Sequence, residues 1–234
     1  MNCGAHINMI ASGSVKPRSP SDLSPKWWLR ADAAEITLVG DDVSVWLDRT
    51  ANNHDCSETS ARPKWIAEHA ALNNRPAVEF ASGEGMATIA GVESVSDWTI
   101  LGVFDVPALA AAACWLVDGS ATLQPALRNN DAAKDLGYYD GAWHDIAAPI
   151  TGPQSIIWRL EQGANEGRIY RNGVNLGAST YAATKTPLHA SGGYLLVGHT
   201  GFTVYLADLL AIPSAVDAMD LAFLMAYTLG RYGV

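Results

Sequence analysis

The sequence is short of cysteines and of long hydrophobic runs. Its three cysteines are Cys3, Cys56 and Cys114, and an odd, low number predicts free thiols rather than a disulfide framework. No uninterrupted apolar run reaches the roughly 18 residues that a membrane-spanning helix needs. The first residues lack the basic and apolar regions of a Sec signal peptide. These absences predict a chain that folds in a cytoplasm, has no signal peptide and has no membrane partner.

Basic residues are also scarce, because 15 Lys and Arg stand against 24 Asp and Glu, for a net charge of −9. Proteins that bind a nucleic-acid backbone gain affinity from clustered basic side chains, which release counterions. The basic residues here are scattered along the chain, so we expect no nucleic-acid partner. Hydrophobic residues make up 49% of the chain and charged residues 17%, which is typical of a globular protein with a substantial core.

Short segments that alternate apolar and polar residues recur at roughly 8–12 residue intervals, with turn residues between them, and this predicts an all-β sandwich or barrel. In residues 41–50 we expect Val43, Val45 and Leu47 on one face of a strand and Trp46 on the other. Residues 97–106 predict a strand with two apolar faces. The other expected strands lie in residues 25–33, 75–89, 112–119, 135–141, 142–150, 154–162, 192–200 and 201–212.

The stretch Arg168–Gly177, with the sequence RIYRNGVNLG, predicts a β-hairpin. Its Asn172-Gly173 pair tolerates the positive φ angles of a type I′ turn, whose twist matches paired strands. A hairpin is not stable alone in water, so we expect this one to form the edge ribbon of a larger sheet.

One helix is predicted, over residues 215–229. Ser214 is the expected N-cap and Gly230 the expected C-cap. The apolar residues at helical spacing predict one face packed on the sandwich; they are Val216, Met219, Phe223, Leu224 and Tyr227.

Residues 1–24 are rich in Ser, Pro, Gly and Asn and have no sustained periodicity, which is typical of an arm or linker. Such a segment buries little apolar surface against its own domain. We therefore expect the arm to dock on a neighbouring subunit or on another component of an assembled particle, with Ile7, Met9 and Ile10 as its apolar anchors.

Taken in order, several of these segments resemble the concanavalin A-like, laminin-G-like jelly-roll domain of bacterial and phage proteins. The resemblance covers about residues 22–234 and leaves residues 1–21 outside as the arm. It implies an antiparallel jelly-roll sandwich of two sheets and roughly twelve to fourteen strands, with a closing helix. The segments that carry it are residues 25–33, 43–55, 73–88, 97–106, 168–177, 194–212 and 229–233.

Members of this fold that cleave β-glucans carry two Glu and one Asp on one strand, spaced E-x-D-x-x-E. No E-x-D occurs in this chain, and a turn is expected between Glu79 and Glu84. His144 and Asp145 are adjacent on an expected strand, so they point to opposite faces and do not form a base–orienter pair. No G-x-S-x-G, H-E-x-x-H or phosphate-binding glycine motif is present. We expect a protein that is not an enzyme.

Two sets of residues are candidates for binding. Lectin-type relatives often hold calcium at loop tips through carboxylates and carbonyls, and the loop after residue 47 offers Asp48, Asn52, Asn53 and Asp55. Apart from calcium, no cofactor is predicted. Aromatic rings stack on sugars while polar side chains bond the hydroxyls, so a loop-like stretch is a candidate glycan rim; it contains Tyr138, Tyr139, Asp140, Trp143 and His144.

These observations favour a lectin-like structural module of a bacteriophage virion, from the tail, baseplate or fibre. Its expected partners are other virion proteins or copies of itself, and a host-surface glycan. It would fold in the host cytoplasm and dock through its arm. The alternatives are a capsid decoration protein with no glycan role, a glycan-active enzyme with a site that these motifs do not cover, and a bacterial surface lectin exported without a Sec signal.

Overall fold

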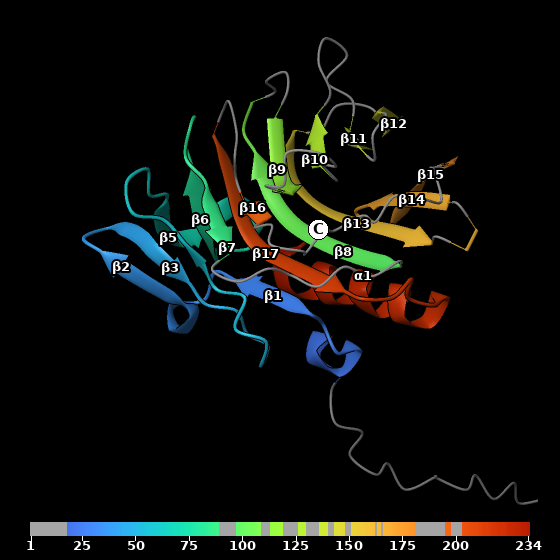
Figure 1. The fold of residues 1–234 in the computed structure, drawn as a ribbon, viewed down its shortest axis with the longest axis horizontal. Helices are drawn as coiled ribbons and strands as arrows, with labels where there is room; N and C mark the ends of the chain where they lie inside the picture. Colours follow the sequence, from blue (N-terminus) through green and yellow to red (C-terminus); the bar gives the residue numbers. More distant parts are fainter. Residues whose placement is uncertain are drawn as a thin grey trace, which may run out of the picture.

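The computed structural model describes residues 18–88, 97–108, 151–161, 163–164, 166–180 and 203–234, and the backbone of five further strands. It contains strands β1–β17, the short 3-10 helices η1–η3 and one C-terminal α-helix, α1 (Figure 1). Their bounds are η1 Pro20–Leu23, β1 Trp27–Arg30, η2 Ala33–Glu35, β2 Ile36–Val39, β3 Asp42–Trp46, β4 Cys56–Ser57, β5 Lys64–His69, η3 Ala70–Leu72, β6 Arg75–Phe80, β7 Met86–Thr88, β8 Trp98–Val106, β9 Ala113–Asp118, β10 Ala126–Asn129, β11 Leu136–Tyr139, β12 Trp143–Ala147, β13 Gly152–Glu161, β14 Glu166–Arg171, β15 Val174–Thr180, β16 Leu195–Val197, β17 Val204–Ile212 and α1 Ala218–Tyr232.

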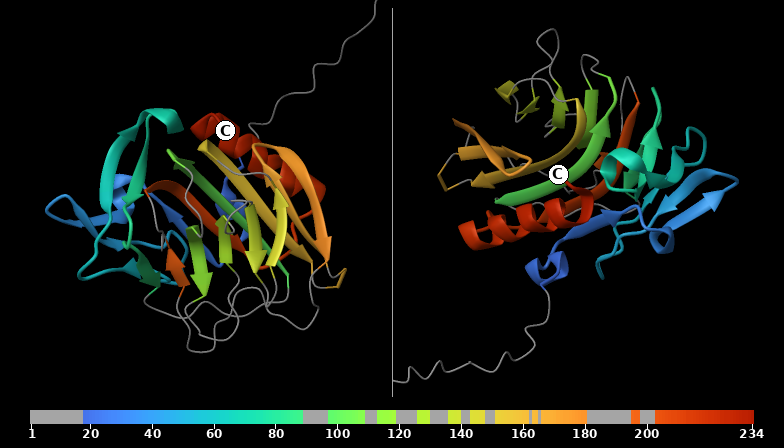
Figure 2. Two further views of the ribbon diagram at one scale, coloured as in Figure 1. Left: turned by 90° about the horizontal axis from the view of Figure 1, so that it is seen from above. Right: turned by 180° about the vertical axis from the view of Figure 1, so that it is seen from behind.

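The strands form two layers with antiparallel pairing, which confirms the predicted sandwich and closing helix. In the layer next to α1, β8 pairs with β17 and β13, and the layer continues through β1, β6 and β5 on one side and β14 and β15 on the other. The second layer runs β12-β11-β10-β9-β16-β7-β4-β3-β2. A pairing of Asp42 with Lys64 joins the layers at one edge. Figure 2 shows the same arrangement from two further sides.

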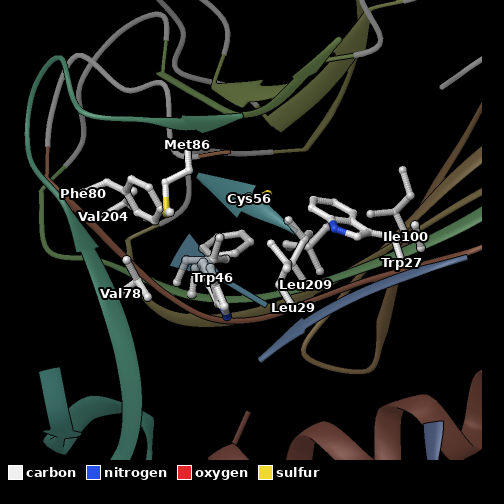
Figure 3. Close-up of a cluster of buried hydrophobic side chains, with 14 of the residues drawn as sticks. Trp27, Leu29, Trp46, Cys56, Val78, Phe80, Met86, Ile100, Val204 and Leu209 are labelled. Atoms are coloured by element: carbon white, nitrogen blue, oxygen red, sulfur yellow. The ribbon is translucent and has the colours of Figure 1, made fainter. Parts of the chain in front are cut away.

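Strand β8 separates two hydrophobic clusters because its residues alternate between the faces of the sheet. Trp98 and Ile100 belong to the cluster between the two layers, where Trp27, Trp46 and Met86 also lie (Figure 3). Leu101 and Val103 belong to a second cluster under α1. Every residue of β8 is buried, as the apolar pattern on both faces predicts. The sheet is therefore covered on one side by strands and on the other by the helix.

The alternation predicted for residues 43–47 is wrong, because β3 carries a β-bulge. Thr37 pairs with Val45 and Leu38 pairs with Val43, so Ser44 is an extra residue without a partner on β2. The extra residue shifts the side-chain alternation by one position. As a result Val43 and Trp46, three residues apart, are both fully buried.

The hairpin prediction is confirmed, and its turn makes a specific contact. β14 and β15 are joined by Asn172 and Gly173, with φ angles of 47° and 78°. The Asn172 side-chain oxygen accepts a hydrogen bond of 2.7 Å from the Ser155 backbone N–H on β13. The Asn172 N–H donates to the Ser155 carbonyl at 2.9 Å. The turn is thus attached to the neighbouring strand as well as closing the hairpin.

Helix α1 begins later than the sequence pattern predicts. Asp217, rather than Ser214, is the N-cap, and its carboxylate accepts from the Asp220 N–H at 2.8 Å. Gly230 lies inside the helix, and Gly233 is the C-cap with φ 78°. Met219, which the sequence pattern placed on the packed face, is 70% exposed. The buried face is formed by Leu224, Thr228 and Tyr232 at four-residue spacing.

The predicted arm is structured in its last part. Ser19 caps η1, and Leu23 packs into the cluster under α1. Arg18 forms an ion pair with Asp220 and lies 4.8 Å above the ring of Phe223. The segment from residue 18 onward therefore packs on the helix of its own domain, without apolar periodicity of its own. Residues 1–17 lie outside the described residues, and with them the predicted anchors Ile7, Met9 and Ile10.

Candidate functional site

A surface cleft of about 480 Å³ lies where the segment before β1 meets the loop after β3. One wall comes from residues 21–28 and the other from residues 49–52. The lining groups are hydroxyls, an amide, two cations and one indole, and none of them is acidic. They belong to Ser21, Ser24, Pro25, Lys26, Trp28, Arg49, Thr50, Ala51 and Asn52.

Asp48 organises the loop that forms the second wall. Its Oδ1 accepts from the backbone N–H groups of Trp28 and Thr50, each at 3.0 Å. Its Oδ2 accepts from the Thr50 hydroxyl at 2.6 Å and from the His54 N–H at 3.0 Å. Four donors therefore hold this carboxylate inside the loop. The carboxylate is therefore used inside the loop, and the residues that line the cleft include no acidic side chain.

The loop is also attached directly to the first wall. The Arg49 N–H donates to the Trp28 carbonyl at 2.8 Å, and the Asn52 side-chain amide donates to the Lys26 carbonyl at 2.8 Å. These bonds cross more than twenty positions of sequence. They fix the distance between the two walls, so the cleft is formed before any ligand arrives.

Trp28 and Arg49 both line the cleft and contact each other. The Arg49 guanidinium lies 4.7 Å above the indole ring, within the range of a cation–π contact. Glu35 and Asp32 contact Arg49 through its Nη1 atom. Trp28 is 4% exposed, so little of its surface is open to solvent.

The four residues of the predicted calcium loop lie in one loop, but they do not converge on one point. Asp48 is occupied by four donors, and the Asp55 carboxylate accepts from the Asp48 N–H at 2.7 Å. Asn52 donates to Lys26, and Asn53 adopts φ 58° as a turn residue. Within the part of the chain that the structure describes, no group of three or more His, Cys, Asp or Glu is placed to hold a metal. Calcium binding stays a prediction.

The predicted glycan rim lies on strands rather than in a loop. Tyr138 pairs with His144, and Tyr139 pairs with Trp143, across the β11–β12 hairpin. Glycan binding by these residues stays a prediction. Asp140 lies outside the described residues.

Sequence reasoning missed a row of titratable residues on the helix side of the sheet. Tyr205 on β17 is flanked by Glu79 on β6 and Asp105 on β8. The His69 Nε2 atom lies 2.8 Å from an Asp105 carboxylate oxygen, and the His69 ring stacks on Tyr205 with centroids 4.2 Å apart. Burial raises the pKa of Tyr205, and the two flanking carboxylates raise it further. The row joins four distant segments, so only the strand order could have revealed it.

No family model and no curated protein matches this sequence, but solved structures share its fold. Domain 4 of AbnA, a GH43 extracellular arabinanase from Geobacillus stearothermophilus solved with arabinotriose, aligns with a TM-score of 0.65 and 13% identity over 86% of this chain and 98% of that domain. The binding domain of Paraclostridial Mosquitocidal Protein 1 aligns with a TM-score of 0.63 and 14% identity over 88% of this chain and 53% of that chain. Trypanosoma rangeli sialidase in complex with sialic acid aligns with a TM-score of 0.57 and 12% identity over 85% of this chain and 32% of that chain.

These likenesses show a shared β-sandwich fold. The chain spans nearly all of the arabinanase domain, about half of the mosquitocidal binding domain and about a third of the sialidase. Among the described residues, no helix is long and apolar enough to span a membrane.

Proposed function

We propose that this chain is a lectin-like, non-enzymatic β-sandwich that binds a glycan in the cleft beside Trp28. The cleft itself carries the proposal. Its hydroxyl, amide and cationic groups are suited to sugar hydroxyls, and the Arg49 guanidinium that stacks on Trp28 also lines the cleft. Its volume lies within the range of small-molecule sites.

The fold supports the same proposal. Domain 4 of the arabinanase was solved in complex with arabinotriose, so a domain of this fold holds an oligosaccharide in at least one structure. A fold alone does not determine a function, and for that reason the proposal depends on the cleft.

The test fills the cleft without removing a native contact. Ala51 is exposed on the rim, so Ala51→Trp should block the cleft and leave the fold intact. Ala222→Trp, at an exposed position on α1, is the matched control. We expect binding on a glycan array, and to arabinotriose in calorimetry if the ligand is related, to be lost only in the first variant. Loss in both variants, or in neither, contradicts the assignment.

Two additions to this experiment separate the predicted sites. Trp143→Ala tests the β11–β12 hairpin, and should leave binding unchanged if the cleft holds the glycan. Repeating the array with calcium and with a chelator tests the loop Asp48–Asp55. If binding depends on Trp143 and not on Ala51, the ligand lies on the hairpin.

We also propose that the module is a bacteriophage virion component of the tail, baseplate or fibre, docked through residues 1–21. The sequence resemblance and the composition of the arm support this. A capsid decoration protein without a glycan role is the nearest alternative. Mass spectrometry of purified particles should detect the chain, and electron microscopy of the particles would show its position.

A glycan-active enzyme is the second candidate, and the row Glu79–Tyr205–Asp105 is the observation that favours it. Neighbouring strands lie about 4.8 Å apart, so backbones two strands apart are separated by roughly 9.6 Å. Inverting glycosidases hold their two carboxyl groups about 6.5–9.5 Å apart. His69 would hold Asp105 in place. We rank this below binding because the cleft lies elsewhere.

A further inference from the structure

Helix α1 exposes only apolar residues and glycine. It lies on the outside of the sheet (Figures 1 and 2). Met219 is 70% exposed and Leu229 is 65% exposed. At 3.6 residues per turn, all of its exposed residues fall within about one third of the helix circumference. They form what we call the outer face of α1, which consists of Ala218, Met219, Ala222, Ala226, Leu229 and Gly230.

The charged groups of α1 are turned toward its own domain. The helix carries two of them, Asp220 and Arg231. Asp220 forms an ion pair with Arg18, and the Arg231 Nη2 atom lies 2.6 Å from an Asp32 carboxylate oxygen. A surface helix ordinarily presents polar residues to water, whereas a helix that is apolar all round is ordinarily buried. The outer face is therefore suited to contact with another protein surface.

The outer face has an internal two-fold symmetry about the level of Leu224. Its two large residues stand five positions on either side of that level, and its four small residues stand two and six positions on either side. In an antiparallel pair of these helices, Met219 of one copy lies level with Leu229 of the other, and Ala222 lies level with Ala226. The small residues at the centre allow the two helix axes to approach closely. This is the self-complementary relation that a two-fold contact between identical chains requires.

Electrostatics favours the same orientation. A helix dipole is positive at its N-terminus and negative at its C-terminus. An antiparallel pair therefore sets the positive end of each helix beside the negative end of the other. A parallel pair would set like ends together, and would bring the exposed Asp217 of one copy level with Asp217 of the other. The outer face itself carries no charge, so two copies meet without burying one.

We propose that the outer face of α1 pairs antiparallel with the same face of a second copy, about a two-fold axis level with Leu224. A helix of 15 residues is about 22 Å long, so the contact is smaller than a standard interface of about 800 Å² per partner. We therefore expect a weak dimer that forms at high protein concentration. The contact uses no residue of the glycan cleft and does not depend on it. Ala222→Trp should weaken the dimer and leave glycan affinity in calorimetry unchanged.

The first test measures self-association of the full chain by sedimentation over a wide concentration range. Met219→Lys with Leu229→Lys sets like charges level with each other in the pair, whereas Met219→Glu with Leu229→Lys sets opposite charges there. We expect the first variant to raise the dissociation constant at least roughly tenfold, and the second to associate more tightly than the first. Val174→Lys, at a 60% exposed position in β15, should match the unmodified chain.

The second test determines the orientation of the pair. In a background with Cys3→Ser and Cys114→Ser, chains with Ala222→Cys are mixed with chains with Ala226→Cys and oxidised. The remaining native cysteine, Cys56, is fully buried. The antiparallel pair sets position 222 level with position 226 of the other copy, so disulfide-linked dimers should form mostly between the two kinds of chain. Mass spectrometry distinguishes them from dimers of one kind, which a parallel pair would give.

Three outcomes overturn the proposal. The first is a full chain that stays monomeric at all concentrations. The second is association that the two lysines leave unchanged, and the third is cross-linking confined to chains of one kind. Deleting residues 1–17 should leave the association unchanged. Association that disappears with these residues also contradicts the pairing of two outer faces, and would assign the contact to the arm.

Discussion

The indole nitrogen of Trp28 donates a hydrogen bond of 2.7 Å to the carboxylate of Asp208, which is completely buried. The other oxygen of this carboxylate accepts from the hydroxyls of Tyr227 at 2.5 Å and Tyr232 at 2.9 Å. One buried carboxylate therefore connects β1, β17 and α1. It also fixes the indole of Trp28, a residue that lines the proposed glycan cleft.

Replacing this carboxylate should destabilise the protein. In Asp208→Leu the buried donors of Trp28 and Tyr232 and the half-buried hydroxyl of Tyr227 lose their acceptor, and an unsatisfied buried polar group costs about 1–3 kcal/mol. We expect the free energy of unfolding in urea to fall by at least about 3 kcal/mol. Asp208→Asn keeps one acceptor oxygen and should lose less. A loss below that of Asp41→Asn, an exposed control, would show that the network contributes little.

The pH dependence of stability should also reveal Asp208. Burial raises its pKa above the ordinary aspartate value, although its three hydrogen-bond donors and Arg30 lower it. A raised pKa means that the folded state binds the proton more tightly than the unfolded state. The stability that Asp208 provides is therefore greatest below the ordinary pKa of about 4, and it falls as the pH rises through the raised value. The difference in unfolding free energy between the unmodified chain and Asp208→Asn should shrink over that interval, and a difference that grows contradicts the assignment.

The turn of the β14–β15 hairpin allows its hydrogen bond to be separated from its backbone strain. Asn172 has φ 47° and accepts from Ser155 at 2.7 Å. Asn172→Gly keeps the backbone conformation and removes only the side-chain bond, so we expect a loss of about 1 kcal/mol. Asn172→Ala adds the strain of a positive φ, for about 1–2 kcal/mol more. Urea unfolding of both variants measures the two contributions, and equal losses would show that the strain is negligible.

The start of α1 can be tested with two substitutions. The structure assigns the N-cap to Asp217, whereas the sequence pattern favoured Ser214. Asp217→Ala should lower the unfolding free energy by about 1 kcal/mol. Ser214→Ala should have little effect, because Ser214 uses its backbone carbonyl to accept from Thr99. The reverse order of effects would move the helix start back to residue 215.

Local patterns predicted much of this fold because they depend on neighbouring residues. The Asn172-Gly173 turn, the two-faced apolar strand β8 and the closing helix each follow from a few adjacent positions. The prediction failed where a distant partner decides the outcome. The bulge at Ser44 reverses the expected faces of β3, and it is visible only in the pairing with β2.

The candidate sites show the same limit. The cleft forms because the Asn52 amide reaches the Lys26 carbonyl and the Trp28 N–H reaches Asp48. These contacts join segments that are distant in the sequence, and no local pattern predicts them. The stretch that carries the predicted rim pairs as the hairpin β11–β12, and glycan binding there stays a prediction.

Catalysis can be tested at the row formed by Glu79, Tyr205 and Asp105 on the helix side of the sheet. We expect the purified protein to release no reducing sugar from β-glucans or arabinan at any pH from about 4 to 9, a range that spans the ordinary pKa values of carboxyl and imidazole groups. Glycoside hydrolysis needs one protonated and one ionised carboxyl group facing the same bond. Glu79 and Asp105 are separated by Tyr205, and His69 occupies Asp105. Turnover that disappears in Glu79→Gln and in Asp105→Asn, but persists in Glu84→Gln, would overturn the non-enzymatic assignment and identify the row as an inverting site. Turnover that all three variants retain would point to a contaminating hydrolase, since it would not depend on the carboxylates of this row.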